Sequence, residues 1–139
     1  MFLLDTNVVS ELRKAGNGKC HRNVSAWAQS VATSTMFLSV ISVLELEVGV
    51  LLIERRDEAQ GVLLRTWLHG QVLPAFSGRI LNIDSAVATL CARLHLPKRR
   101  ADRDAFIAAT ALTHGMTVVT HNIKDFQLIG VKLFDPWET

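Results

Sequence analysis

The sequence predicts an α/β protein of three layers, α/β/α, with a central, mostly parallel sheet of about five strands. Short β-favouring runs alternate with longer stretches of helical periodicity. The first short run, Phe2-Leu3-Leu4, is wholly apolar, which is typical of a strand buried on both faces. The chain has 139 residues, 49% of them hydrophobic and 20% charged, so we expect residues 1–139 to form a single packed domain.

Apolar spacing and the residues that start or stop helices set the order of the elements. In chain order we expect a strand at 2–4, helices at 8–12 and 24–31, a strand at 36–38, helices at 42–55 and 58–72, a strand at 79–83, helices at 85–94 and 104–114, and strands at 116–120 and 131–134. Gly115 is placed as the stop of the helix before it. Residues 97–103 have no periodicity and should form an exposed loop. In the helix at 58–72, Val62, Leu63 and Trp67 should face inward.

Polar residues follow several of the predicted strands. In an open parallel sheet, ligands bind beyond the carboxyl ends of the strands. Asp5 follows the first strand, Glu45 follows the second after one helical turn, and Thr120 and Asn122 follow the fourth. Asp104 opens the helix that leads into the fourth strand and heads an apolar stripe, so it should point inward. These positions would bring three carboxylates to one end of the sheet.

Each of these residues also has a purely structural interpretation. Asp5 and Asp104 could be N-caps of the helices that they precede, with Asp102 competing for the second position. Ser42 and Glu45 have the spacing of a capping box. The polar pair after the fourth strand could simply form a turn. The residues taken singly therefore leave both interpretations open.

Glu45 provides a sharper indication of a ligand site. Its helical neighbours are apolar or small, which predicts a buried stripe made of Ile41, Val48, Gly49 and Leu52. A glycine inside a helix costs about 1 kcal/mol of helix stability. An approaching ligand or close helix packing would explain why Gly49 is there.

The three carboxylates together indicate a cation. Side by side they would repel one another and raise their pKa values unless a cation joined them. Oxygen ligands without Cys or His suit a hard ion such as Mg²⁺ or Mn²⁺. Mg²⁺ held by carboxylates commonly works on a substrate phosphate, so the pattern favours phosphodiester chemistry.

Four segments resemble, in order, the motifs of PIN-domain ribonucleases. They are Phe2-Leu3-Leu4-Asp5-Thr6-Asn7-Val8-Val9-Ser10-Glu11, Ser39-Val40-Ile41-Ser42-Val43-Leu44-Glu45-Leu46-Glu47-Val48-Gly49, Asp104-Ala105-Phe106-Ile107-Ala108-Ala109-Thr110-Ala111 and Thr117-Val118-Val119-Thr120-His121-Asn122. The chain looks closest to VapC-type toxins of type II toxin–antitoxin pairs. Its closing Phe134-Asp135-Pro136-Trp137 is similar to the signature of the FitB-like branch.

The resemblance implies a PIN-like fold and cleavage of RNA with Mg²⁺ or Mn²⁺ held by Asp5, Glu45 and Asp104. Thr120 and Asn122 would position waters or phosphate oxygens. Asn122 stands where many members carry Asp, and Asp125 lies a turn later, so we expect one well-held ion and leave a second open. The resemblance also implies a small DNA-binding antitoxin as cognate partner, a homodimer and a higher toxin–antitoxin assembly.

The charge of the chain permits a polyanionic partner without identifying one. Fifteen Lys and Arg residues against thirteen Asp and Glu residues give a net charge of +2. Lys98, Arg99, Arg100 and Arg103 precede Asp104, and they could contact RNA phosphates or form a solvated loop. With no tyrosine and only 6% aromatic residues, a shaped RNA loop is a better substrate than a long stacked strand.

Several classes of protein are excluded. Cys20 and Cys91 are too few for a disulfide framework and lack the spacing of a zinc site. No secretion signal or membrane span is expected, because the apolar stretch at 37–53 contains Glu45 and Glu47, and we expect a cytoplasmic protein. A receiver domain would need a paired acid beside Asp5 and a lysine directly after a late strand, and neither is found. A haloacid-dehalogenase-type phosphatase needs Asp-x-Asp after its first strand, whereas here Asp5 is followed by Thr6 and Asn7. A housekeeping RNA-processing PIN nuclease and a non-catalytic PIN-like binding module remain as alternatives.

Overall fold

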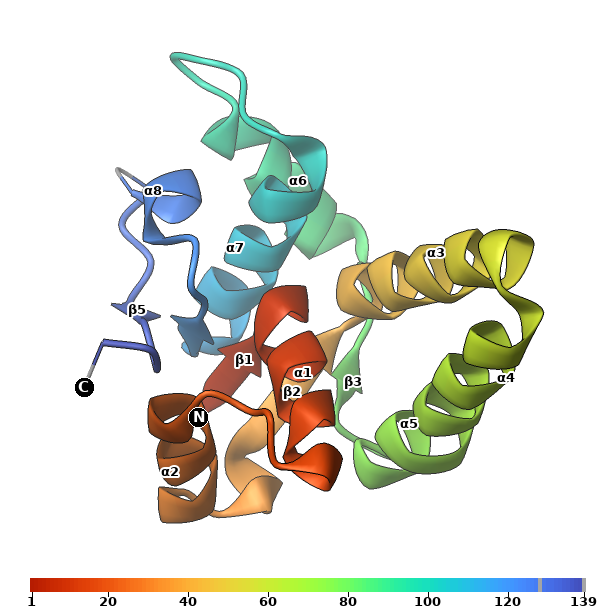
Figure 1. Ribbon diagram of the computed structural model, residues 1–139. Coiled ribbons are helices and arrows are strands. Elements are labelled where there is room, and N and C mark those ends of the chain that lie inside the picture. The colour runs from red at the N-terminus through yellow and green to blue at the C-terminus, as the bar shows by residue number, and fades with distance from the viewer. Residues whose placement is uncertain (128, 139) are drawn as a thin grey trace.

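The computed structural model describes residues 1–127 and 129–138, and its centre is a five-stranded parallel sheet (Figure 1). The strands are β1 (Phe2–Leu4), β2 (Met36–Ser39), β3 (Ile80–Leu81), β4 (Thr117–Val119) and β5 (Leu133–Phe134). Their order in the sheet is β3-β2-β1-β4-β5, and all neighbouring pairs are parallel. The chain moves outward from β1 in both directions, so β1 and β4 flank the switch point at which such sheets bind ligands. The predicted α/β class is confirmed.

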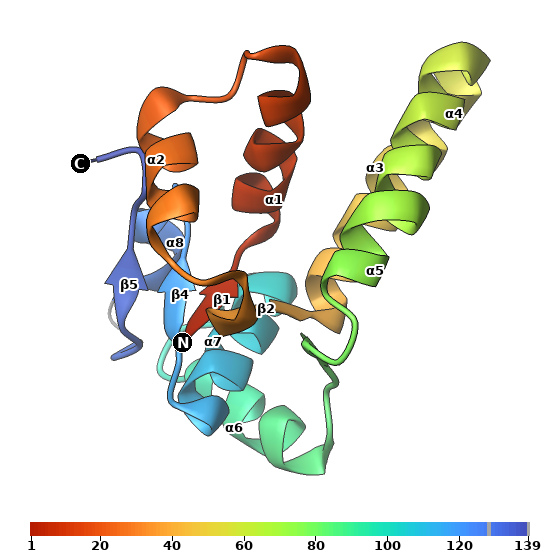
Figure 2. The ribbon, with the colours of Figure 1, turned by 90° about the horizontal axis from the view of Figure 1, so that it is seen from below.

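Helices cover both faces of this sheet. They are α1 (Thr6–Arg13), α2 (Arg22–Ser30), α3 (Val40–Arg56), α4 (Glu58–Trp67), α5 (Leu73–Ala75), α6 (Ser85–Leu94), α7 (Asp102–His114) and α8 (Ile123–Phe126). Two short 3₁₀ helices, η1 (Lys14–Asn17) and η2 (Thr33–Thr35), and a π-helix, η3 (Leu68–Val72), join some of them. Figure 2 shows α1 and α2 on one side of the sheet and α6 and α7 on the other. The helices α3, α4 and α5 extend outward together as an arm. In the described part of the chain, no helix has the length and apolar character needed to cross a membrane.

Adjacent residues of the central strands serve the two opposite cores. Leu4 and Val119 belong to the core beneath α1 and α2, whereas Leu3 and Val118 pack with α7. All four side chains are fully buried. Because side chains of a strand point alternately to its two faces, a wholly apolar run is what a strand covered on both sides requires.

The helix starts differ from the predicted caps in two places. Ser39, not Ser42, is the N-cap of α3, and its hydroxyl accepts a hydrogen bond from the Ile41 amide. The capping-box prediction is therefore wrong, because the helix begins directly after β2 and Ser42 lies buried inside it. The N-cap of α7 is Ala101, and both acidic candidates lie in the first turn. The predicted stop at Gly115 is confirmed by its left-handed φ of 65°.

The inner face of α4 differs from the prediction at Val62 and Leu63, whereas Trp67 packs against the core as predicted. Gly61 is buried, while Val62 and Leu63 are 57% and 63% exposed. A Cβ at Gly61 would lie 2.7 Å from the Cα of Glu54, so α3 and α4 approach closely only along this glycine. Arg65 of α4 holds the same contact with a two-pronged ion pair to Glu54, at 2.9 Å for each prong. Close backbone approach, rather than apolar spacing, decides which face of α4 turns inward.

Candidate active site

Asp5 is fixed at the carboxyl end of the central strand. Its Oδ1 atom accepts a hydrogen bond from the Thr6 backbone amide at 2.8 Å, which makes it the N-cap of α1. Its Oδ2 atom accepts from the Thr120 hydroxyl at 2.8 Å and from the Asn7 side-chain amide at 3.3 Å. The carboxylate is only 5% exposed. The capping and the functional interpretations of Asp5 are thus compatible.

Thr120 acts on Asp5, and Asn122 acts on Thr120. The Thr120 hydroxyl is fully buried, and because it has one hydrogen, that hydrogen is used on Asp5. Its oxygen accepts from the Asn122 backbone amide at 2.9 Å. The side chain of Asn122 is exposed at the surface above this network. This geometry makes Thr120 a positioning residue for Asp5 and leaves only Asn122 exposed to a water or a phosphate oxygen.

Glu45 reaches the same end of the sheet from α3. Its Oε1 atom accepts a hydrogen bond from the Thr6 hydroxyl at 2.8 Å, and the Thr6 oxygen lies 3.1 Å from the Ser42 hydroxyl. On its other side, the Glu45 Oε2 atom lies 3.7 Å from the Arg103 guanidinium. Thr6 therefore links Asp5, at the end of β1, to Glu45 of α3, because its backbone amide binds Asp5 and its side chain binds Glu45.

The buried stripe predicted around Glu45 is wrong. Leu52 is 57% exposed, and the buried residues of α3 are Ser42, Leu46 and Val50. A Cβ at Gly49 would have no heavy atom within 4 Å, so close packing within this chain does not explain that glycine. The arm carries α3 away from the sheet (Figure 2). Glu45, with a side chain 28% exposed, lies between the buried residues Ser42 and Leu46.

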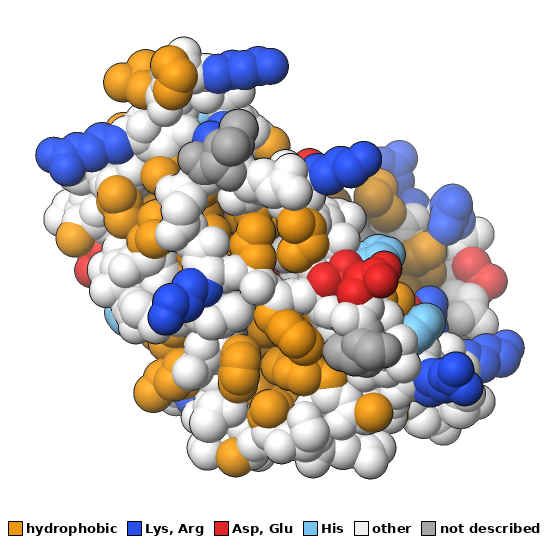
Figure 3. All heavy atoms as spheres, turned by 90° about the vertical axis from the view of Figure 1, so that its left-hand side faces the viewer, with side chains coloured by type: hydrophobic (Ala, Val, Ile, Leu, Met, Phe, Trp, Pro, Cys, Tyr) orange, Lys and Arg blue, Asp and Glu red, His pale blue; other side chains and the backbone are white. Residues whose placement is uncertain are grey.

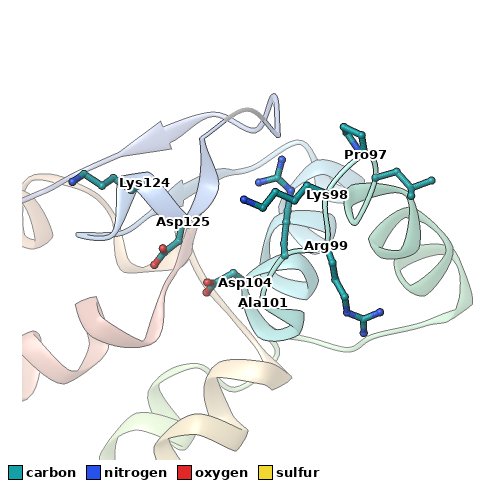
Figure 4. A pocket seen from close by; sticks show the side chains of 9 residues that line it. Pro97, Lys98, Arg99, Ala101, Asp104, Lys124 and Asp125 are labelled. Atoms are coloured by element: carbon teal, nitrogen blue, oxygen red, sulfur yellow. The ribbon is translucent and has the colours of Figure 1, made fainter.

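Asp104 and Asp125 reach into one pocket between α7 and α8 (Figure 4). The pKa of Asp104 is raised to about 6, mainly by burial and then by the negative charges of Asp5, Asp125 and Glu45. Burial also raises the pKa of Asp5, against the hydrogen bonds from Thr120 and Thr6, and the charges of Glu45 and Asp125 add to the rise. The three predicted acids and Asp125 thus lie within electrostatic reach of one another.

The donor set fits a hard divalent cation. In residues 1–127 and 129–138, no three His, Cys, Asp or Glu side chains are already gathered as a finished metal site. The acids here present only oxygen donors, and the pKa values of Asp5 and Asp104 are raised mainly by burial and further by neighbouring negative charges. A cation would remove this repulsion, and Mg²⁺ and Mn²⁺ prefer such ligands.

The structure adds residues that were not predicted for the site. Thr6 holds Glu45, Ser42 contacts the Thr6 hydroxyl, and Arg103 is the cation that lies beside Glu45. Ser42 and Glu45 are three residues apart, so a shared helix face could have been inferred. The contact with Thr6 depends on how α3 crosses α1, which no local pattern records.

A second polar group lies beside the site near the end of the chain. The His121 backbone amide donates to Asn7 at 3.3 Å, and its ring nitrogen lies 3.3 Å from the Asp135 carboxylate. The ring also stacks on Trp137, with centroids 4.3 Å apart. Figure 3 shows acidic and histidine side chains gathered on this face, whereas Lys and Arg side chains stand mostly singly. These contacts occupy Trp137.

Comparison with known proteins agrees with this fold. The chain matches the PIN domain over residues 2–132. It is 35% identical to the VapC ribonuclease Y4jK of Sinorhizobium fredii over 99% of both chains. The crystal structure of FitAcB from Neisseria gonorrhoeae matches 100% of both chains with a TM-score of 0.89 and 36% identity. A toxin–antitoxin complex from Klebsiella pneumoniae matches 100% of both chains with a TM-score of 0.69 and 27% identity. The chain therefore belongs to the PIN-domain family and resembles its VapC and FitB members from end to end.

Proposed function

We propose that this chain is a divalent-metal-dependent endoribonuclease that acts as the toxin of a type II toxin–antitoxin pair. The observation that carries the proposal is the convergence of Asp5, Glu45 and Asp104 at the carboxyl end of a parallel sheet, where the pKa values of both aspartates are raised. A relative of similar length is a VapC ribonuclease, which supports RNA as the substrate. A protein of the same fold is part of a toxin–antitoxin complex, which supports the biological role.

Asp5 and Asp104 would hold Mg²⁺ or Mn²⁺, and Glu45 would hold the ion or orient a water. When bound, the ion would supply an activated water and stabilise charge on the scissile phosphate. The remaining work falls to groups of this chain. Thr120 fixes the Asp5 carboxylate, and Thr6 fixes Glu45. Asn122 offers an amide but no charge, so one well-held ion is the expectation.

Two apolar surfaces support a protein partner. A groove of about 200 Å³ between α1 and the arm is lined by apolar side chains that include Leu12, Trp67 and Phe76. On the arm itself, Leu51 and Leu52 of α3 are 52% and 57% exposed, and Val62 and Leu63 of α4 are 57% and 63% exposed. Contiguous exposed apolar surface commonly marks a protein interface. A small DNA-binding antitoxin, a second copy of the chain and a higher assembly of both are the proposed occupants.

The decisive experiment is expression of the chain with and without the small gene beside its own, with RNA ends mapped by sequencing. We expect growth arrest and new RNA ends without the neighbouring gene, and neither when both are expressed. Asp5→Asn is the matched control and should produce neither effect. RNA cleavage without growth arrest would favour the housekeeping nuclease. Absence of new RNA ends with the wild-type chain would favour the non-catalytic binding module.

A further inference from the structure

We propose that the pocket between α8 and the loop joining α6 to α7 holds the RNA backbone beside the cleavage site, with Lys98 and Lys124 contacting its phosphates. The inference rests on the proposed ribonuclease function and adds the residues that receive the substrate. The pocket has a volume of about 520 Å³. Its lining combines Asp104 and Asp125 with four cations, namely Lys98, Arg99, Arg100 and Lys124.

The pocket connects directly to the proposed metal site. Asp104 belongs to both, because it lines the pocket and lies within electrostatic reach of Asp5 and Glu45. In Figure 4 Lys98 extends toward the carboxylates of Asp104 and Asp125 from one side, and Lys124 stands on the other side with its side chain directed outward. An RNA strand whose scissile phosphate meets the acids would therefore pass lysines on either side.

The ion pairs of the region single out these two lysines. Among the described residues, Arg99 pairs with Asp102 at 3.4 Å, and Arg103 lies 3.7 Å from Glu45. Lys98 and Lys124 make no ion pair within residues 1–127 and 129–138, although two carboxylates line the same pocket. Cations that stay unpaired beside carboxylates are suited to a ligand that brings its own negative charge.

Arg100 holds the two walls of the pocket together. Its guanidinium donates to the Leu94 carbonyl at 2.8 Å, at the end of α6, and to the Gln127 carbonyl at 3.3 Å, just after α8. Its backbone amide donates to the His95 ring at 3.1 Å. All these contacts are internal, so Arg100 sets the separation of the walls that carry Lys98 and Lys124.

A polynucleotide and its divalent ion satisfy both kinds of lining group at once. A free anion such as inorganic phosphate would meet the lysines but also the repulsion of Asp104 and Asp125. A metal ion alone would meet the acids but also the repulsion of the lysines. Bound RNA places its phosphates against the lysines while the ion neutralises the acids, so the mixed lining favours the combination.

The test measures binding of a fluorescein-labelled single-stranded RNA by anisotropy in Mg²⁺, with Asp5→Asn present in every protein to prevent cleavage. For the double variant Lys98→Ala and Lys124→Ala we expect roughly tenfold weaker binding at low salt, and a slope of log affinity against log salt smaller by about 1.4, at about 0.7 per phosphate contact. Lys98→Arg with Lys124→Arg should restore the slope. In proteins that keep Asp5, the double alanine variant should raise KM and leave kcat near its original value.

Lys132→Ala is the control, because it removes one lysine charge at the opposite end of the sheet. Lys132 precedes β5, and its carbonyl accepts from the Val118 amide. An unchanged salt slope in the double variant, or an equal loss in Lys132→Ala, would overturn the inference while RNA cleavage by the unmodified chain still stood. If the unmodified chain neither bound nor cleaved RNA, the proposed function would fail and this inference with it. Thermal melting of each variant checks that the fold is retained.

Discussion

Thr120 donates its hydroxyl hydrogen to Asp5 across 2.8 Å, and both side chains are buried at the junction of the two central strands. The bond joins residues that are 115 positions apart in the chain. Burial raises the pKa of Asp5, and the Thr120 hydrogen bond is the largest influence that lowers it. Thr120 therefore favours the ionised form of Asp5 and fixes the orientation of its carboxylate.

Replacement of Thr120 should weaken Mg²⁺ binding more than it lowers the stability of the folded protein. Thr120→Val keeps the shape of the side chain but removes the donor, so the pKa of Asp5 should rise and its orientation should loosen. Loss of such a supporting contact typically costs about 10–100-fold in metal affinity or activity. A Mg²⁺ titration of RNA cleavage should shift to higher concentration in Thr120→Val and far less in Thr120→Ser. An identical Mg²⁺ dependence in all three proteins would contradict the positioning role.

Removal of either central acid should abolish cleavage without unfolding the protein. Asp5→Asn and Asp104→Asn keep the size of the side chain but lose the charge that would bind the ion. EDTA should stop cleavage by the unmodified protein, and Mg²⁺ should raise its Tm, because a ligand at about 100 times its Kd adds roughly 2.7 kcal/mol of stability. The Tm gain should be lost in Asp5→Asn. A variant with normal far-UV circular dichroism and full activity would refute the assignment.

Asp104 should make the metal-free protein more stable in weak acid than at neutral pH. Its pKa in the folded protein is raised to about 6 from the ordinary 3.8, so between these values the folded state binds more protons than the unfolded state. Its contribution to stability is therefore largest below pH 3.8 and is lost as the pH rises through 6. In EDTA, urea denaturation should show Asp104→Asn to be more stable than the unmodified protein at pH 7. The difference should disappear near pH 3.5, and lower stability of Asp104→Asn at pH 7 would contradict the raised pKa of Asp104.

Two glycines of the arm should respond to alanine in opposite directions. Gly61→Ala places a Cβ against the Glu54 backbone and should destabilise the protein by about 1–3 kcal/mol. Gly49→Ala adds a Cβ in open space on the exposed part of α3 and should stabilise it by about 0.5–1 kcal/mol. Urea denaturation of both variants measures the contrast. Equal effects would show that the close approach of α3 and α4 is not what selects glycine at 61.

The sequence was sufficient to predict the sheet and the meeting of the three acids. The carboxyl ends of parallel strands share one edge, so residues directly after strands, such as Asp5, or leading into one, such as Asp104, can be placed by rule. The helix starts were harder, because a serine at 39 and a serine at 42 are both plausible caps, and only the end of β2 decides between them.

What could not be predicted depends on how elements cross in space. Thr6 reaches Glu45 because α1 and α3 start from neighbouring strands and lie close together. Val62 and Leu63 face outward because Gly61 is the residue that permits close backbone contact. Hydrophobic periodicity records how apolar a face is, and it does not distinguish a face buried within the chain from one left for a partner.

The bond between Asp5 and Thr120 has a consequence during protein synthesis. A nascent chain that has left the ribosome only as far as α6 contains Asp5 and Glu45, but it lacks Asp104, β4 and the hydroxyl that orients Asp5. Its first strand then has no β4 beside it. Catalytic competence thus arises only when late segments return to the start of the chain, and prematurely terminated translation products should be harmless to the RNA around them.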